Sequence, residues 1–146
     1  MQRPDLDAPL RIMTVIWIVL SMGVVMFAAV AYGLLTTGAV DLDALEPSLV
    51  SMISLVLMLV MAGGLVAGRR LESAIPRDTP STEKIQRYQA ARIIAMACQE
   101  GPALAIMALS MLAGSRNWVI GAATVGVWTM FLARPRREDL EALLRG

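Results

Sequence analysis

Four long apolar stretches constrain the fold of this chain more than any other feature of its sequence. They contain a single charged residue, Glu100, and they span about residues 12–35, 48–68, 93–113 and 117–133. An α-helix rises about 1.5 Å per residue, so each stretch approaches or exceeds the length that crosses roughly 30 Å of hydrocarbon, with the fourth at the lower limit. None shows the alternation of barrel strands, so we expect an all-α fold with four transmembrane helices.

The composition also favours a membrane protein. Of the 146 residues, 57% are hydrophobic and 17% are charged, which leaves too few polar side chains to cover a soluble domain of this size. The length suits one integral membrane domain over residues 1–146, surrounded by a lipid bilayer. The first stretch is about twice as long as a signal-peptide core and follows Asp5 and Asp7, so we expect a retained helix rather than a cleaved signal.

Basic residues gather on one side of the expected membrane. Of the 13 Lys and Arg residues, only Arg116 lies between the third and fourth stretches, and the connection after the first stretch contains none. The others precede the first stretch, follow the fourth, or lie near the connection after the second. Because basic loops stay in the cytoplasm, we expect two hairpins with the N- and C-termini both cytoplasmic.

The third helix is expected to extend beyond the membrane. From Pro80 to the third apolar stretch the sequence contains no helix breaker, so this segment should form a charged, cytoplasmic stalk. After Pro135, a short tail helix places Leu140, Leu143 and Leu144 on one face, which lies either on the membrane surface or against the stalk. The expected helices span about residues 12–35, 48–68, 80–113, 117–133 and 135–145.

Composition excludes several kinds of functional site. The chain contains no His, which excludes zinc sites, Ser-His triads and haem ligation by His. Its one cysteine, Cys98, excludes an intramolecular disulfide. The net charge of +1 gives no footprint for nucleic acid. We therefore expect no metal, no cofactor, no nucleic-acid partner and no enzymatic activity.

Glu100 is the most informative single residue of the sequence. It lies eight residues beyond Arg92, and therefore about 12 Å into the membrane, slightly to the cytoplasmic side of the midplane. A charged and unpaired carboxylate costs several kcal/mol at that depth. Two outcomes are physically reasonable: the carboxylate takes up a proton, or it faces the protein interior and meets a partner.

Three polar residues are candidate neighbours of Glu100. Gln99 adds a second polar side chain beside it. Arg92 is nearly in line with Gln99 on the same helix, but it is too far from Glu100 for an easy direct bond. Ser21 on the first helix has the best matching depth among residues on other helices. These residues predict an intramembrane polar site in the third helix.

A local break in the backbone adds to this site. Pro102 has no amide N–H, which leaves the carbonyl of Cys98 without its helical partner. Gly101 permits bending and the close approach of another helix. Ion and proton sites in membrane helices combine a broken backbone with polar side chains in this way. Polar residues that fix helix packing give the same sequence pattern.

Small residues indicate where helices pack closely. Gly64 and Gly68 form a GxxxG motif beside Gly63, and we expect the Gly63–Gly64 pair to contact another subunit. The same spacing recurs on the third and fourth helices, so the expected packing positions are Gly63, Gly64, Gly68, Gly101, Ala122 and Gly126.

The second half of the chain resembles a family of small bacterial four-helix membrane proteins with no assigned activity. The resemblance lies in EKIQRYQAARIIAMACQEGPAL (83–104), LAGSRNW (112–118) and RPRREDLEALL (134–144). It matches Lys84, Tyr88, Glu100 to Leu104, Gly114, Arg134 to Pro135 and Asp139 to Leu140. The resemblance implies a multi-pass protein of the bacterial inner membrane built around Glu100, and it implies no reaction.

A looser likeness is to the duplicated-hairpin proteolipids of rotary ATPases, which also carry a buried Glu among small residues. Those proteins place the carboxylate on the second helix of a hairpin. Here Glu100 lies on the first helix of the second hairpin, and the dense glycine repeats are missing. The likeness is therefore an analogy only.

Two functional hypotheses follow. The first is a non-enzymatic integral membrane protein that acts as a homo-oligomer or as a small subunit of a larger membrane complex, with Glu100 and Gln99 organising helix packing. The second is a small ion- or proton-conducting protein in which Glu100 is the titrating group. A membrane enzyme ranks third, because the loops offer no paired carboxylates near a Ser or Cys nucleophile.

Overall fold

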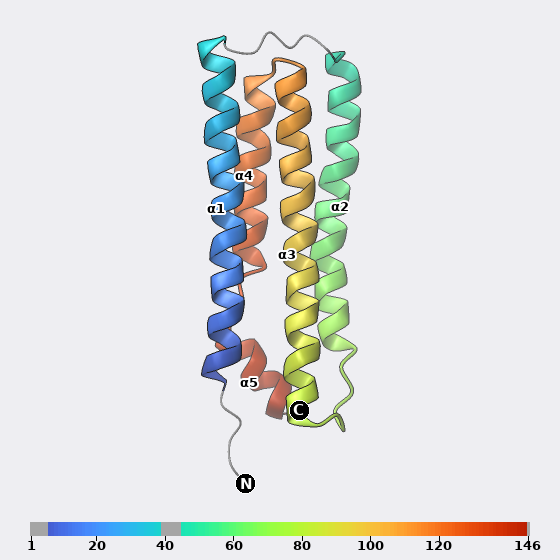
Figure 1. Ribbon diagram of the computed structural model, residues 1–146. Helices are drawn as coiled ribbons and strands as arrows, with labels where there is room; N and C mark the ends of the chain where they lie inside the picture. The colour runs from blue at the N-terminus through green and yellow to red at the C-terminus, as the bar shows by residue number, and fades with distance from the viewer. Residues whose placement is uncertain (1–5, 39–44, 146) are drawn as a thin grey trace.

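The computed structural model describes residues 6–38 and 45–145, and within these ranges every regular element is helical (Figure 1). The all-α prediction is therefore confirmed. Five helices follow in chain order: α1 Asp7–Thr37, α2 Pro47–Ser73, α3 Ser81–Leu112, α4 Arg116–Leu132 and α5 Arg137–Arg145. The expectations that concern Arg3, Asp5 and residues 39–44 fall outside the described residues.

The helix ends follow local sequence signals. Pro47 occupies the first turn of α2, where a backbone N–H would have no acceptor within the helix, so its absence in proline costs no hydrogen bond. Gly38 after α1 and Gly114 after α3 adopt φ angles of 65° and 62°, which side chains other than glycine rarely tolerate. Helix α1 begins five residues earlier than expected, at Asp7, and α2 ends five residues later than expected, at Ser73. The expected bounds were those of the apolar stretches, and each helix continues beyond its apolar stretch.

Helix α3 is the centre of the bundle. It packs against α2, α4, α1 and α5, and α1 also packs along α4. In Figure 1, α1 and α2 stand on opposite sides of α3. The four long helices therefore form a triangle of α1, α3 and α4, with α2 attached to α3.

Two apolar cores hold this arrangement. The larger core joins α1, α3 and α4 through fully buried residues that include Val24, Ala103, Ile106 and Met107. The smaller core lies at the end of the bundle that holds α5, the α5 end; it consists of Met13, Ile75, Ile85, Tyr88 and Leu140.

The tail helix docks against the stalk of α3. Leu140 is 0% exposed, and the ammonium group of Lys84 donates to the carbonyl of Leu143 over 3.5 Å. Of the two positions that the sequence allowed for the tail, the structure shows contact with the stalk. The start of α1 lies at the same end of the bundle (Figure 1).

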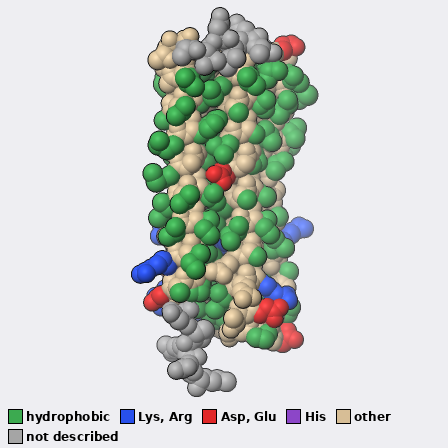
Figure 2. All heavy atoms as spheres, in the orientation of Figure 1, with side chains coloured by type: hydrophobic (Ala, Val, Ile, Leu, Met, Phe, Trp, Pro, Cys, Tyr) green, Lys and Arg blue, Asp and Glu red, His purple; other side chains and the backbone are tan. Residues whose placement is uncertain are grey.

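Helices α1 and α3 and residues Ser48–Ser73 of α2 are long and apolar enough to cross a membrane. Helix α4 has 17 residues, at the lower end of the usual range for a membrane span. The outer surface is apolar along most of its length, with Leu59 as much as 73% exposed, and basic side chains gather towards the α5 end (Figure 2). These features indicate a membrane protein.

Candidate functional site

Glu100 lies midway along α3, on the side that faces α1. Its Oε1 atom is 3.3 Å from the position that a Cβ atom would occupy on Gly23 of α1. The side chain is half-buried, and within the described residues the structure shows no hydrogen bond or ion pair to it. Figure 2 shows an acidic patch midway along a face that is otherwise largely apolar. The carboxylate therefore lies at the surface of the bundle and not in its core.

Gln99 points in a different direction, towards α2. It is 0% exposed, and its Nε2 atom donates to the carbonyl of Met61 over 2.9 Å. No donor among the described residues reaches its Oε1 atom. Of the pair Gln99 and Glu100, Gln99 is thus the side chain that bonds to another helix of this chain, a role that the sequence had suggested for both.

Glycine lets α2 approach α3 closely beside Gln99. A Cβ atom on Gly64 would overlap the Cβ of Cys98, and one on Gly68 would lie 2.7 Å from the Cβ of Ala95. Gly63, by contrast, has open space where its side chain would be. The expectation that the Gly63–Gly64 pair faces another subunit is therefore wrong for Gly64, because the crossing of α2 and α3 already uses it.

Pro102 and Gly101 occupy different surfaces of α3. Pro102 is buried and leaves the carbonyl of Cys98 without an amide donor four residues later. Gly101 faces open space, and Cys98 is a half-buried free thiol. The break in the hydrogen-bond ladder involves Cys98 and Pro102, each two residues from Glu100, while the side chains of Gln99 and Glu100 point in different directions.

Ser21 forms its contact with α4 rather than with Glu100. Its hydroxyl donates to the sulfur of Met130 over 3.4 Å, and the indole N–H of Trp17 donates to the Met130 carbonyl over 2.8 Å. Ser21 is therefore part of the α1–α4 contact, and its expected pairing with Glu100 is wrong. The depth argument selected the correct level on α1 but not the correct side.

Arg92 belongs to a separate cluster at the α5 end. Its Nε atom is 2.7 Å from Oε1 of Glu72, and its Nη2 atom donates to Oδ2 of Asp139 over 2.7 Å. The guanidinium carbon also lies 5.2 Å from the centre of the Tyr88 ring, within cation–π range. Its assignment to the intramembrane polar site is therefore wrong, because Arg92 joins α2, α3 and α5.

The remaining small residues pack within the chain. Ala122 is 1% exposed, and a Cβ atom on Gly126 would lie 2.9 Å from the Cβ of Ala103 and 3.4 Å from Cγ1 of Val24. Gly126 therefore marks the point where α4 meets both α3 and α1.

Sequence reasoning missed Gly23 as the neighbour of Glu100 and missed both acidic partners of Arg92. Gly23 lies two residues beyond Ser21, so the depth argument that selected Ser21 was the available signal for the first. The partners of Arg92 had no comparable signal, because Asp139 lies 47 residues along the chain, in a helix whose docking depends on tertiary packing.

The described residues contain no cluster of three His, Cys, Asp or Glu side chains arranged to hold a metal ion. Comparison of the chain with protein-family models, with curated proteins and with solved structures finds no match. The geometry of the bundle is therefore the basis for any statement about function.

Proposed function

We propose that this protein is a non-enzymatic integral membrane protein that assembles with a further membrane helix, supplied by a second copy or by a larger complex. The observation that carries the proposal is the position of Glu100 over Gly23, at the surface of the apolar section, with no partner among residues 6–38 and 45–145. An isolated chain leaves this carboxylate against hydrocarbon, which is costly. A neighbouring helix that donates a hydrogen bond relieves that cost.

The surroundings of Glu100 suit such a contact. Gly23 lies beside the carboxylate, and Gly101, the next residue of α3, has open space where its side chain would be. Small residues allow two helix backbones to approach closely in a membrane, where packing and hydrogen bonds drive association. Because Gln99 already joins α3 to α2, Glu100 remains available for a contact outside the chain.

The proposal includes a bacterial inner-membrane location, with α4 as the fourth span and with the α5 end in the cytoplasm. The distribution of basic residues supports this orientation, since Arg116 is the one Lys or Arg between α3 and α4. Arg116 also has a structural use at that end, because its guanidinium donates to the carbonyl of Leu35 over 2.9 Å. A reporter fused to the C-terminus should therefore be active in the cytoplasm.

The assembly state tests the main proposal. We expect labelled wild-type copies in liposomes to show energy transfer, or the purified protein to retain a membrane partner in mild detergent. Glu100→Leu should lose that association, and Glu100→Gln should keep most of it because the amide still forms hydrogen bonds. Glu138→Gln, on the exposed surface of α5, is the matched control. A wild type that stays monomeric and partner-free at all protein-to-lipid ratios would refute the proposal.

The alternative function is proton or ion conduction through Glu100. The surface position of the carboxylate favours it, and Pro102 removes the usual helical donor of the nearby Cys98 carbonyl. This alternative predicts that wild-type liposomes conduct and that Glu100→Gln assembles normally but does not. Absence of flux through the assembled wild type contradicts it.

A further inference from the structure

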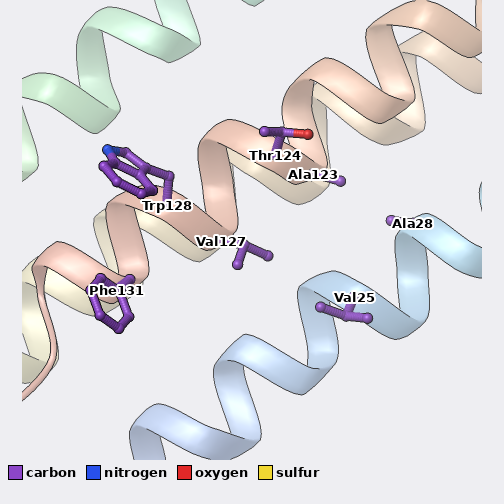
Figure 3. Close-up of a pocket in the computed structure, with 7 residues that line it drawn as sticks. All are labelled: Val25, Ala28, Ala123, Thr124, Val127, Trp128 and Phe131. Atoms are coloured by element: carbon purple, nitrogen blue, oxygen red, sulfur yellow. The ribbon is translucent and has the colours of Figure 1, made fainter.

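An apolar groove runs between α1 and α4, on a surface distinct from the Glu100 face. It has a volume of about 640 Å³ and opens sideways from the bundle. In Figure 3, Val25 faces Val127 across the groove, and Ala28 faces Ala123. The two alanines are small, so they leave space between helices that are otherwise in contact.

The lining of the groove offers almost nothing to a polar ligand. Its polar side-chain groups are the hydroxyl of Thr124 and the indole N–H of Trp128. The Thr124 hydroxyl donates to the carbonyl of Ile120 over 2.8 Å within its own helix, so this donor is already used. The groove suits an apolar occupant, and its volume is within the roughly 300–1,000 Å³ of small-molecule pockets.

Aromatic side chains mark the part of the groove nearest the α5 end. Trp128 is 65% exposed and Phe131 is 46% exposed, and their rings stack with centroids 6.5 Å apart. Trp is typical of the region where hydrocarbon meets lipid headgroups. The groove therefore leads from the middle of the membrane towards one interface.

A cation follows directly after the aromatic pair. Arg134 lies three residues beyond Phe131, and its amide donates to the Phe131 carbonyl over 3.3 Å, so the chain continues the helical turn to it. Arg134 is exposed, as is Arg136, and neither has an ion-pair partner in the part of the chain that the structure describes. Two exposed cations therefore follow the end of α4, just beyond the aromatic part of the groove.

The length of this arrangement identifies the occupant. Ala123 and Phe131, the first and last α4 residues that line the groove, are eight residues apart, which corresponds to about 12 Å along a helix. One leaflet contributes half of the roughly 30 Å hydrocarbon core. A second copy of a bundle helix would need a contact along the whole span, whereas an acyl chain needs the depth of one leaflet.

We propose that the α1–α4 groove binds one acyl chain of an anionic phospholipid, with the lipid phosphate on Arg134. Basic residues at the membrane surface between transmembrane helices recognise anionic headgroups in this way. The site would hold a lipid of the leaflet at the α5 end. It does not depend on assembly through Glu100, because α1 and α4 form it within one chain.

Tryptophan quenching by brominated phospholipids tests this proposal. In a Trp17→Phe, Trp118→Phe background, Trp128 is the remaining tryptophan and reports lipid in the groove. We expect anionic brominated lipid to quench Trp128 more strongly than zwitterionic brominated lipid at equal mole fraction. Arg134→Gln should reduce this preference roughly fivefold, the equivalent of about 1 kcal/mol per cation at an anionic surface. Arg70→Gln on α2 is the control for charge.

Filling the groove provides a second, independent test. Ala123→Leu should reduce quenching by both lipids, whereas Ala29→Leu, on the exposed side of α1, should not. Circular dichroism checks each fold, and Ala28→Leu on the opposite wall replaces any variant that loses helicity. Equal quenching by both lipids, equal effects of Arg134→Gln and Arg70→Gln, or a Trp128 that no lipid quenches because another chain covers it would each overturn the proposal.

Discussion

Arg92 and Asp139 are 47 residues apart in the sequence, yet Nη2 of Arg92 donates to Oδ2 of Asp139 over 2.7 Å. The same guanidinium contacts Glu72, so one side chain links α3 to α2 and to α5. The Arg92 side chain is only 11% exposed. Water therefore cannot easily replace Arg92 as the partner of Glu72 and Asp139, and the position of the tail helix depends on Arg92.

We predict that Arg92→Gln destabilises the protein by about 2 kcal/mol and loosens α5, because Glu72 loses its ion-pair partner and Asp139 loses a charged hydrogen-bond donor. Arg87→Gln is the matched control on the same helix. Arg87 pairs with Glu83 at the exposed surface, where such a pair contributes less than about 0.5 kcal/mol. Denaturation in mixed micelles and limited proteolysis of the tail would measure both effects. Equal stability of the two variants would contradict the assigned role of Arg92.

Gly64 and Gly63 form a second matched pair. Gly64→Ala should destabilise the bundle by about 1–3 kcal/mol, because its Cβ would overlap Cys98 and push α2 away from α3. Gly63→Ala should be neutral or stabilise by up to roughly 1 kcal/mol, because nothing lies within 4 Å and alanine favours the helix. Thermal unfolding in detergent distinguishes the two. If Gly63→Ala is the more harmful, Gly63 and not Gly64 is the glycine at a close contact, and the assigned role of Gly64 fails.

The helices were predictable because membrane spans are long apolar runs with charged ends. The side of each helix that faces its neighbour was not. Glu100 and Gln99 are consecutive, so a rotation of α3 by about 100° would turn Glu100 into the direction that Gln99 has, and close contacts such as that of Gly64 with Cys98 select the rotation observed. The depth of Ser21 in the membrane could be counted from the sequence, but its contact with Met130 depends on how α1 packs against α4.

Long-range charge pairs were equally hard to predict. Arg92 begins an apolar run and has several acidic residues within reach in sequence, so nothing local selects Glu72 and Asp139. Their meeting requires the turn at 74–80 and the docking of Leu140 into the core at the α5 end. The tail leucines indicated that a docking face exists, and packing determined which surface it covers.

Gln99→Leu should cost no more than about 1 kcal/mol, although Gln99 is fully buried. The substitution removes the bond from Nε2 to the Met61 carbonyl, and hydrogen bonds between membrane helices average roughly 0.6 kcal/mol. It also removes Oε1, which has no donor among the described residues, so part of the loss is recovered. Gln99→Glu should be far more damaging, because it replaces the donor to Met61 with a second acceptor. Unfolding of both variants in mixed micelles would rank them.

The tail helix should weaken in acid through Glu141. Arg137 and Arg145 donate hydrogen bonds to its two carboxylate oxygens, at 2.8 Å and 3.0 Å, and these bonds lower the pKa of Glu141 from its ordinary value of 4.5. The charged form is thus favoured in the folded helix. The stabilisation is complete well above pH 4.5 and is lost as the pH falls through the lowered pKa.

We therefore expect hydrogen-exchange protection factors of α5 to decrease below pH 4.5 in the wild type. Glu141→Gln should show weaker protection at neutral pH and a smaller decrease in acid, because its amide carries no charge to lose. The difference between the two pH profiles isolates Glu141 from the other acidic residues of the tail. Parallel profiles would show that Glu141 does not produce the acid response, and the prediction for Glu141 would fail.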